Sequence, residues 1–443
     1  MAKLKYMIVL EKIRNKIFWI VDFLKGSPIK KHVYNIKHIV EFPESQENII
    51  EQNNTLNNVL KFASTMVPYY CNSNSIKLTD FPVINKNIIR DNLEKFIAKD
   101  QTKENLIQVV TSGSTGTPFK VYHNQNKKNR NTADTFYFGK QAGFSLGEKL
   151  VYFKIWTQVN SKSKIKSFIQ NIDMQDVMDI SDKKIDSLVE SLKCDKSNKG
   201  ILGYASALEA ICRYLDSNHH EIRIPRINSV IAMSEGLNSY TKEACIKYFS
   251  TNVVSRYSNV ENGIIAQQMT NDTSKEFVIN WASYFIEILE LDNDNNVPLG
   301  KPGRIVITDL YNYAMPMIRY DTGDIGILNW DLNKKRKVLT NVEGRKMDMV
   351  YDTSGNLMSS FTITNNMWLY TEIKQYQFIQ KSENQYLFKL NLNEKFTREE
   401  QLITEFKGYF GQNAEIDIEY VDEIPLLNSG KRRKVVNLYK KTI

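Results

Sequence analysis

The chain has 443 residues, which at about 100 to 200 residues per domain predicts two to four domains and excludes a mini-protein or a disordered tail. Its 59 Lys and Arg residues outnumber its 50 Asp and Glu residues, so the net charge is +9. The content of hydrophobic residues, 42%, and of aromatic residues, 11%, is ordinary for a globular protein. The sequence has no basic stripe interleaved with aromatic residues, so we expect no nucleic-acid binding. Four cysteines without a CxxC pair, and only five histidines, exclude a disulfide framework and a closely spaced zinc site and favour a cytoplasmic location.

The first predicted element is an amphipathic helix over residues 3–25, with six basic residues around a short apolar run. No small-residue cleavage site follows it, so it is not a secretion signal. No segment reaches the roughly 20 apolar residues that a membrane span needs. We expect an ordinary packed helix, with docking on a membrane surface as the alternative and a peripheral location as its consequence. Residues 40–108 then predict helices that serve as scaffold.

A strand, a tight loop and a second strand are predicted over residues 106–122. The loop, TSGSTGTP at 111–118, combines small residues with hydroxyl side chains and backbone N–H groups that can surround phosphate oxygens. It lacks the lysine and the spacing of a P-loop, so a P-loop kinase or GTPase is disfavoured. A polar surface turn is the alternative for this loop. We interpret His123, just beyond it, as a surface histidine, with a position near the binding site as the alternative.

Short apolar runs alternate with helical patterns at 181–193, 206–216 and 240–249, which predicts an α/β fold with a largely parallel sheet. From 281 to 330 the pattern becomes rich in strands, typical of a β-rich subdomain. The last hundred residues predict a hairpin, strands near 374–379, 385–391 and 414–420, and a helix at 397–409. We interpret this part as a small α+β unit that acts as a mobile lid.

Four further segments carry side chains suited to binding chemistry. Tyr257, at the end of an apolar strand, can stack on a base, and Glu261 can hold Mg²⁺ through its carboxylate. Asp324 follows a turn-forming glycine and can accept hydrogens from a diol. The others are Glu343-Gly344-Arg345 and the basic segment 428–434, where a lysine can meet a developing phosphate anion. Each segment alone also has a purely structural interpretation.

Together, in this order and at these separations, the five segments resemble the adenylate-forming superfamily, specifically its phenylacetate–coenzyme A ligase-like branch, which includes homologues found with capsular polysaccharide biosynthesis. The similarity runs from about residue 15 to the end. TSGSTGTP is similar to the family's phosphate loop, YSNVE to its Y-G-x-x-E segment and RYDTGD to its Y-R-T-G-D segment. GR at 344–345 is similar to the hinge-leading G-R, and SGK at 429–431 to the segment with the catalytic lysine.

The resemblance implies a large N-terminal adenylating domain over 1–343, with a helical scaffold over about 1–105, and a C-terminal lid over 344–443. It implies conversion of a carboxylic acid and ATP into an acyl-adenylate and pyrophosphate, followed by acyl transfer to the thiol of coenzyme A or of a carrier protein's pantetheine. Magnesium is the implied cofactor. Surface polysaccharide biosynthesis is an associated pathway, and relatives are monomers or homodimers.

The resemblance also assigns roles to matching residues. Lys431 bridges the attacking carboxylate and the α-phosphate, and Glu261 and Thr115 serve catalysis and Mg²⁺. The implied ATP- and AMP-binding residues are Thr111, Ser112, Gly113, Ser114, Thr115, Gly116, Ser234, Glu235, Gly236, Tyr257, Ser258, Asp324 and Arg345. The candidates for the acyl pocket are Tyr152, Tyr204, Ala205 and Ser206.

Three positions depart from the family pattern. Ser258 replaces the usual glycine after the tyrosine, Asp321 stands where many relatives carry arginine, and Met347 occupies the position of the hinge acid. Because the hinge and the following loop differ, the adenylation half-reaction is better supported than the transfer. Two alternatives stay open: direct transfer to an amine or a sugar, and a nucleotide-binding scaffold without turnover.

Overall fold

The computed structural model describes residues 2–71, 76–111, 119–156, 160–177, 181–219, 221–270, 276–345, 350–358, 363, 367–425 and 433–439. The described part begins with the expected helical scaffold. Its helices are α1 (Ala2–Leu24), α2 (Pro28–Glu41), α3 (Gln46–Met66), α4 (Lys86–Asp91) and α5 (Leu93–Phe96), with short 3₁₀ turns at Leu78–Asp80 and Lys103–Asn105. Side chains cap two of these helices: Ser45 accepts from the Asn48 N–H before α3, and Asn85 accepts from Asn87 and Ile88 before α4.

One sheet of eleven strands forms the centre of the molecule, in the order β10-β11-β12-β13-β9-β8-β7-β6-β5-β3-β4. Its parallel half has β3 (Lys149–Lys154), β4 (Ile172–Asp176), β5 (Lys199–Tyr204), β6 (Ile227–Met233) and β7 (Val253–Asn259). The helices that follow these strands are α7 (Lys164–Gln170), α8 (Asp182–Cys194), α9 (Ala205–Asn218) and α10 (Ser239–Phe249). The predicted α/β alternation is therefore confirmed, with α8, α9 and α10 at the three expected places.

The strand-rich region predicted from 281 onward continues this sheet. Its antiparallel half has β8 (Gly263–Gln267), β9 (Phe277–Ile279), β10 (Tyr284–Leu289), β11 (Pro302–Asp309), β12 (Tyr320–Asp331) and β13 (Arg336–Arg345). A separate antiparallel hairpin, β1 (Ile107–Thr111) and β2 (Phe119–His123), precedes α6 (Gln125–Gln141). Because β8 pairs with both β7 and β9, the two halves share one hydrogen-bonded surface.

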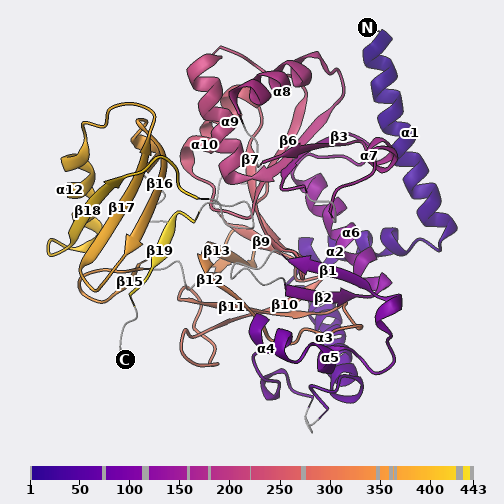
Figure 1. Ribbon diagram of the computed structural model, residues 1–443. Coiled ribbons are helices and arrows are strands. Elements are labelled where there is room, and N and C mark those ends of the chain that lie inside the picture. The colour runs from indigo at the N-terminus through magenta and orange to yellow at the C-terminus, as the bar shows by residue number, and fades with distance from the viewer. Residues whose placement is uncertain are drawn as a thin grey trace.

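The last part of the chain forms its own four-stranded sheet, in the order β18-β17-β16-β19, beside the large sheet (Figure 1). Its strands are β16 (Ile373–Gln380), β17 (Gln385–Leu392), β18 (Glu415–Tyr420) and β19 (Val435–Asn437), with α12 (Glu399–Phe410), a short hairpin of β14 (Val350–Tyr351) and β15 (Leu357–Met358), and a 3₁₀ turn at Met367–Leu369. Phe378, Phe388 and Phe406 are fully buried in a core of this unit's own residues. The division of the chain at 343/344 stays a prediction.

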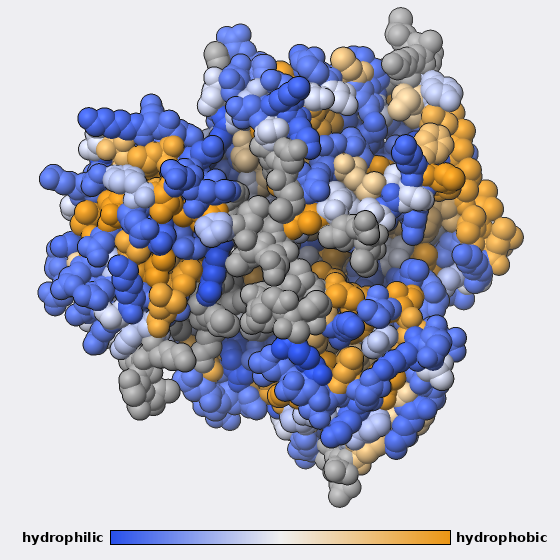
Figure 2. Space-filling model, in the orientation of Figure 1, coloured by the Kyte–Doolittle hydropathy of each residue, from blue (hydrophilic) through white to orange (hydrophobic). Residues whose placement is uncertain are grey.

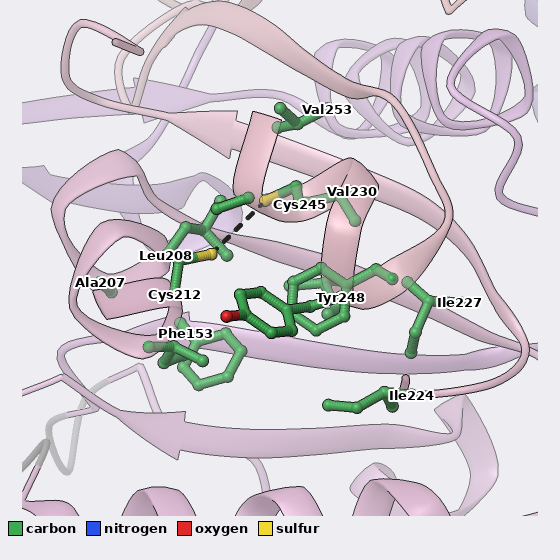
Figure 3. Packing of buried hydrophobic residues seen from close by; sticks show 14 of the residues in the cluster. Phe153, Ala207, Leu208, Cys212, Ile224, Ile227, Val230, Cys245, Tyr248 and Val253 are labelled. Atoms are coloured by element: carbon green, nitrogen blue, oxygen red, sulfur yellow. Dashed lines mark hydrogen bonds between the residues drawn. The ribbon is translucent and has the colours of Figure 1, made fainter. Parts of the chain in front are cut away.

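The core beside the parallel strands is made by α8, α9 and α10 packed on β3, β5 and β6 (Figure 3). Cys212 of α9 and Cys245 of α10 lie in it with their sulfur atoms 4.0 Å apart, both as free thiols. Cys194 is also free but exposed, so burial is not shared by all the cysteines. This packing fixes α9, whose first turn faces the carboxyl ends of the parallel strands.

Candidate functional site

The structure brings two of the predicted segments together at the carboxyl end of β7. Tyr257 donates its hydroxyl hydrogen toward Asp324 Oδ2 at 2.8 Å, and its oxygen also lies 3.2 Å from Thr322 Oγ1. Asp324 belongs to β12, which β13, β9 and β8 separate from β7 in the order of the sheet, so the contact joins residues far apart in both sequence and strand order. Burial raises the pKa of Tyr257 well above its ordinary value, and the Asp324 carboxylate adds to the shift. The phenol therefore stays protonated as a donor.

Glu261 lies in the turn that follows β7, and its side chain is only 2% exposed. Tyr320 donates its hydroxyl hydrogen to Glu261 Oε1 at 2.8 Å, and the Lys86 ammonium is 2.9 Å from the same oxygen. Burial raises the pKa of Tyr320, and the Glu261 and Asp324 carboxylates both reinforce this shift. Tyr257, Glu261, Tyr320 and Asp324 thus form one electrostatic cluster, which we call the candidate site.

Glu261 is the described candidate ligand for a magnesium ion. Among the described residues no group of three or more His, Cys, Asp or Glu could hold a metal. Glu261 therefore offers a single carboxylate, which suits Mg²⁺ because this ion takes most of its ligands from phosphates and water. The Lys86 ammonium pairs with the same carboxylate, and its N–H donors are also suited to phosphate oxygens.

A buried polar layer supports the turn that carries Glu261. With its hydrogen on Nε2, His123 donates to the Glu261 carbonyl oxygen at 2.8 Å, and Tyr284 donates to the Asn262 carbonyl oxygen at 2.5 Å. Burial lowers the pKa of His123 to about 4, helped by the nearby Lys127 ammonium. Our interpretation of His123 as a surface histidine was wrong: the ring is 4% exposed and neutral, since burial favours its uncharged form.

Asp321, the unusual residue in the RYDTGD segment, has a structural partner. Its Oδ2 is 2.7 Å from Arg304 Nη1, so this carboxylate is paired within the β11–β12 ladder. Arg319, two residues earlier, is 4% exposed and pairs with Glu287 at 3.1 Å. The charged residues of this segment other than Asp324 therefore hold the strand and its neighbours in place.

The segments expected to flank the acyl and adenine pockets also meet. Glu235, after β6, accepts from the backbone N–H of Ser206 at 2.9 Å and so places a carboxylate at the first turn of α9. Tyr152 and Tyr204 are half-buried and pack against the same small apolar cluster, which includes Met233. Because β3, β5 and β6 are neighbouring strands, these candidate residues lie in one region, and their role in binding stays a prediction.

Arg256 is a polar residue in this region that sequence reasoning missed. It is 7% exposed, and its Nε donates to Gln267 Oε1 at 2.8 Å. Burial lowers the pKa of its guanidinium to about 10, and the nearby Tyr152 offsets this shift only in part. Its Nη2 has no hydrogen-bond partner within the part of the chain that the structure describes. No local pattern distinguishes this arginine from a surface residue in a strand.

The described end of the basic segment 428–434 contacts α9. Lys434 Nζ is 3.6 Å from Glu209 Oε2, and the same carboxylate oxygen accepts from Asn238 Nδ2 at 3.0 Å. Burial opposes the charge of Lys434, but the neighbouring Tyr376 and Glu209 outweigh it and raise the pKa of this lysine. The C-terminal unit is thus tied to the helix that borders the candidate acyl pocket.

Several predicted residues lie outside this geometry. The phosphate-loop residues 112–118, including Thr115, and Lys431 and Met347 fall outside the described residues. Thr111 ends β1 and Arg345 ends β13 opposite Asp324, and only their backbone is described. Lys86 and Tyr320, which contact Glu261, were assigned no role from the sequence. Tyr320 lies within a recognised segment, whereas Lys86 begins a helix that looked like scaffold.

Comparison with known proteins supports the resemblance found in the sequence. Residues 350–438 match the family described as the CapK C-terminal domain. The chain is 26% identical over 377 residues to protein CapK of Staphylococcus aureus, covering 82% of this chain and 81% of that protein. It is 23% identical over 188 residues to phenylacetate-coenzyme A ligase of Thermus thermophilus, covering 36% of this chain and 42% of that one.

Among solved structures, the fold is similar to that of 2-hydroxyisobutyryl-CoA ligase in the postadenylation state, in complex with an adenylate. The TM-score is 0.71 at 14% identity, covering 91% of this chain and 92% of that one. Against the thioesterification state of the same ligase the TM-score is 0.58, with the same coverage at 16% identity. Both comparisons show that the chain shares the fold of this ligase.

Proposed function

Because the chain is a relative of the adenylate-forming enzymes, in the phenylacetate–coenzyme A ligase-like branch that includes CapK, we propose that it activates a carboxylic acid with ATP and transfers the acyl group to a thiol. The carboxylate attacks the α-phosphorus, the bond between the α- and β-phosphates breaks, and pyrophosphate leaves. A thiolate then attacks the acyl carbon of the adenylate, and AMP leaves. The observation that carries this proposal is the meeting of Tyr257, Asp324 and Glu261 at one strand end.

The residues of the candidate site divide the binding of ATP between them. The Tyr257 ring offers a face for adenine, and Asp324 accepts hydrogens from the ribose hydroxyls while the Tyr257 hydroxyl holds its carboxylate in place. Glu261 would hold Mg²⁺, which when bound neutralises charge on the phosphates. Lys86, 2.9 Å from Glu261, supplies a fixed positive charge close to that position. Lys431 and residues 112–116 complete the proposed set.

The acid and its acceptor are the finer part of the proposal. The half-buried Tyr152 and Tyr204 favour an aryl or aliphatic body. The buried Arg256 favours an acid with a further oxygen acceptor, because this would satisfy a guanidinium nitrogen without a described partner. Coenzyme A or a pantetheine thiol is the proposed acceptor, and a part in surface polysaccharide biosynthesis rests on the sequence resemblance alone.

The test is pyrophosphate release from the full chain with ATP and Mg²⁺ across a panel of aryl, fatty, hydroxy, dicarboxylic and amino acids. We expect release with one class of acid, its loss when Mg²⁺ is chelated, and a fall of about 10²- to 10³-fold in Lys431→Ala, since one transition-state donor is removed. Formation of an acyl thioester with added coenzyme A then tests the acceptor. Tight ATP binding without turnover by any acid would instead favour the scaffold.

A further inference from the structure

Helix α1 turns its polar face toward the protein. Glu11 accepts hydrogen bonds from the backbone N–H and the side-chain amide of Asn198, at 2.8 and 2.9 Å. Asn15 donates to the Leu146 carbonyl oxygen at 2.9 Å, and Asp22 accepts from the first N–H groups of α2 at 3.0 Å. Both acidic residues of α1 are buried, so their carboxylates are fully used within the fold.

The opposite face of α1 presents apolar side chains to solvent. This reverses the usual pattern of a surface helix, whose apolar stripe faces the core. At about 100° per residue these side chains fall on one stripe of the helix. The stripe consists of Val9, Ile13, Ile17, Ile20, Phe23 and Leu24, which are between 42% and 76% exposed. Water therefore meets an apolar surface that the fold itself does not cover.

Helix α7 extends this apolar surface. Ile165, Phe168 and Ile169 are each more than 60% exposed, and the Arg14 guanidinium lies 5.3 Å from the centre of the Phe168 ring, so α1 and α7 are neighbours. We call the stripe on α1 together with these three residues the α1–α7 patch. Figure 2 shows hydrophobic side chains gathered at the right edge of the molecule, where Figure 1 places α1 with α7 beside it. Contiguous apolar surface of this kind marks an interaction site.

The charges around the patch all have one sign. Among the described side chains of α1 and α7, the exposed charged residues are Lys12, Lys16, Lys164 and Lys166, and Lys25 follows directly after α1. No exposed acidic side chain accompanies them on these two helices, because Glu11 and Asp22 are buried. An apolar face whose two helices expose only lysines as charged side chains complements a surface that is apolar inside and anionic outside.

We propose that the α1–α7 patch docks the protein on an anionic membrane surface, with α1 lying in the interface. Insertion of the apolar stripe and attraction of the lysines to acidic headgroups act together in such helices. No helix in the described part of the chain is long and apolar enough to cross a membrane, which fits a helix that lies on it. A second copy of this chain is a poorer occupant, since a twofold interface between two such patches would bring lysines of one copy close to lysines of the other.

The proposal is tested by co-sedimentation of the full chain with phosphatidylcholine vesicles, with and without about 30% phosphatidylglycerol. We expect binding to the anionic vesicles, weak binding to the neutral ones, and weaker binding at high salt because the lysine contribution is screened. Ile17→Ser combined with Ile20→Ser, and Lys12→Glu combined with Lys16→Glu, should each lower the partition coefficient by about tenfold or more.

Two matched variants control for general effects of surface polarity and charge. Leu332→Ser changes an exposed leucine in the β12–β13 turn, and Lys301→Glu changes an exposed lysine before β11. Both should bind vesicles like the unchanged protein. Thermal unfolding of all variants should stay near that of the original chain, because the altered side chains face solvent. Equal binding to neutral and anionic vesicles, or no binding to either, would overturn the proposal. A dimer would also overturn it, if sedimentation velocity shows one for the unchanged protein and only a monomer for the Ile17/Ile20 variant.

Discussion

At the scale of single residues, the Tyr257 hydroxyl orients the Asp324 carboxylate. A carboxylate that receives a hydrogen bond of 2.8 Å on one oxygen is held in one orientation. Because folding has already fixed this orientation, a diol that binds Asp324 does not have to order the carboxylate, and less conformational entropy is lost on binding. The same side chain therefore contributes an aromatic face and an orienting donor.

Tyr257→Phe separates these two contributions, because it keeps the ring and removes the hydroxyl. We expect the KM for ATP to rise by about three- to tenfold, the loss of one net hydrogen bond, with kcat nearly unchanged. Asp324→Asn removes the charged acceptor and should raise this KM by about 100-fold, since hydrogen bonds to charged groups are stronger. ATP-dependent pyrophosphate exchange measures both. An unchanged KM in Tyr257→Phe would contradict the orienting role.

The residues of the candidate site were predictable to different degrees. Tyr257, Glu261 and Asp324 each lie in a short segment whose neighbours mark them, so sequence reasoning selected them. Lys86 and His123 gain their importance only from the fold, which places them against the Glu261 side chain and its carbonyl oxygen. A lysine at the start of a helix and a histidine at the end of a strand carry no local signal of such contacts.

At the scale of elements, the short helix α4 holds Lys86 in place. It has only six residues and so no stability of its own. The Asn85 side chain accepts from the N–H groups of Asn87 and Ile88, at 3.0 and 3.1 Å, and Ile89 anchors the helix in the core. The cap therefore fixes the first turn, from which Lys86 reaches Glu261.

Asn85→Ala should lower the free energy of unfolding by about 1 kcal/mol, as expected for a lost N-cap. It should also raise the KM for ATP with Mg²⁺, because the turn that carries Lys86 becomes less rigid. Asn85→Asp keeps an acceptor and should restore both quantities. Ser45→Ala removes the equivalent cap of α3 and is the matched control: it should lower stability without changing this KM. Equal effects of the two caps on KM would contradict a specific role for α4.

The elements themselves were largely readable from periodicity, but their assembly was not. The alternation of apolar runs and helical patterns identified the parallel strands and α8, α9 and α10, because each βαβ step is local in sequence. The joining of the strand-rich region to the parallel half depends on the pairing of β8 with both β7 and β9. Such pairings carry only the alternation of their own strands, so the sequence predicted a β-rich subdomain but not that its strands extend the parallel sheet.

At the scale of the whole molecule, the Lys434–Glu209 contact ties the C-terminal unit to α9. Lys434 follows Lys431 by three residues, and the two ends of the contact belong to units with separate hydrophobic cores. We therefore expect the ion pair to hold the C-terminal unit against α9, and to break if this unit turns between the two proposed half-reactions.

Reversing the charges tests this contact. Lys434→Glu and Glu209→Lys should each reduce pyrophosphate exchange by about tenfold. The variant that carries both substitutions should recover part of this activity, because a partly buried ion pair contributes a coupling free energy of about 1 to 2 kcal/mol. Acyl transfer from a supplied acyl-adenylate to the thiol should be unchanged or faster, because that step does not need the contact. Lys389→Glu breaks a pair with Glu419 inside the C-terminal sheet and should leave both half-reactions intact. Equal losses in the two half-reactions, without recovery in the double exchange, would mean that the pair only stabilises the fold.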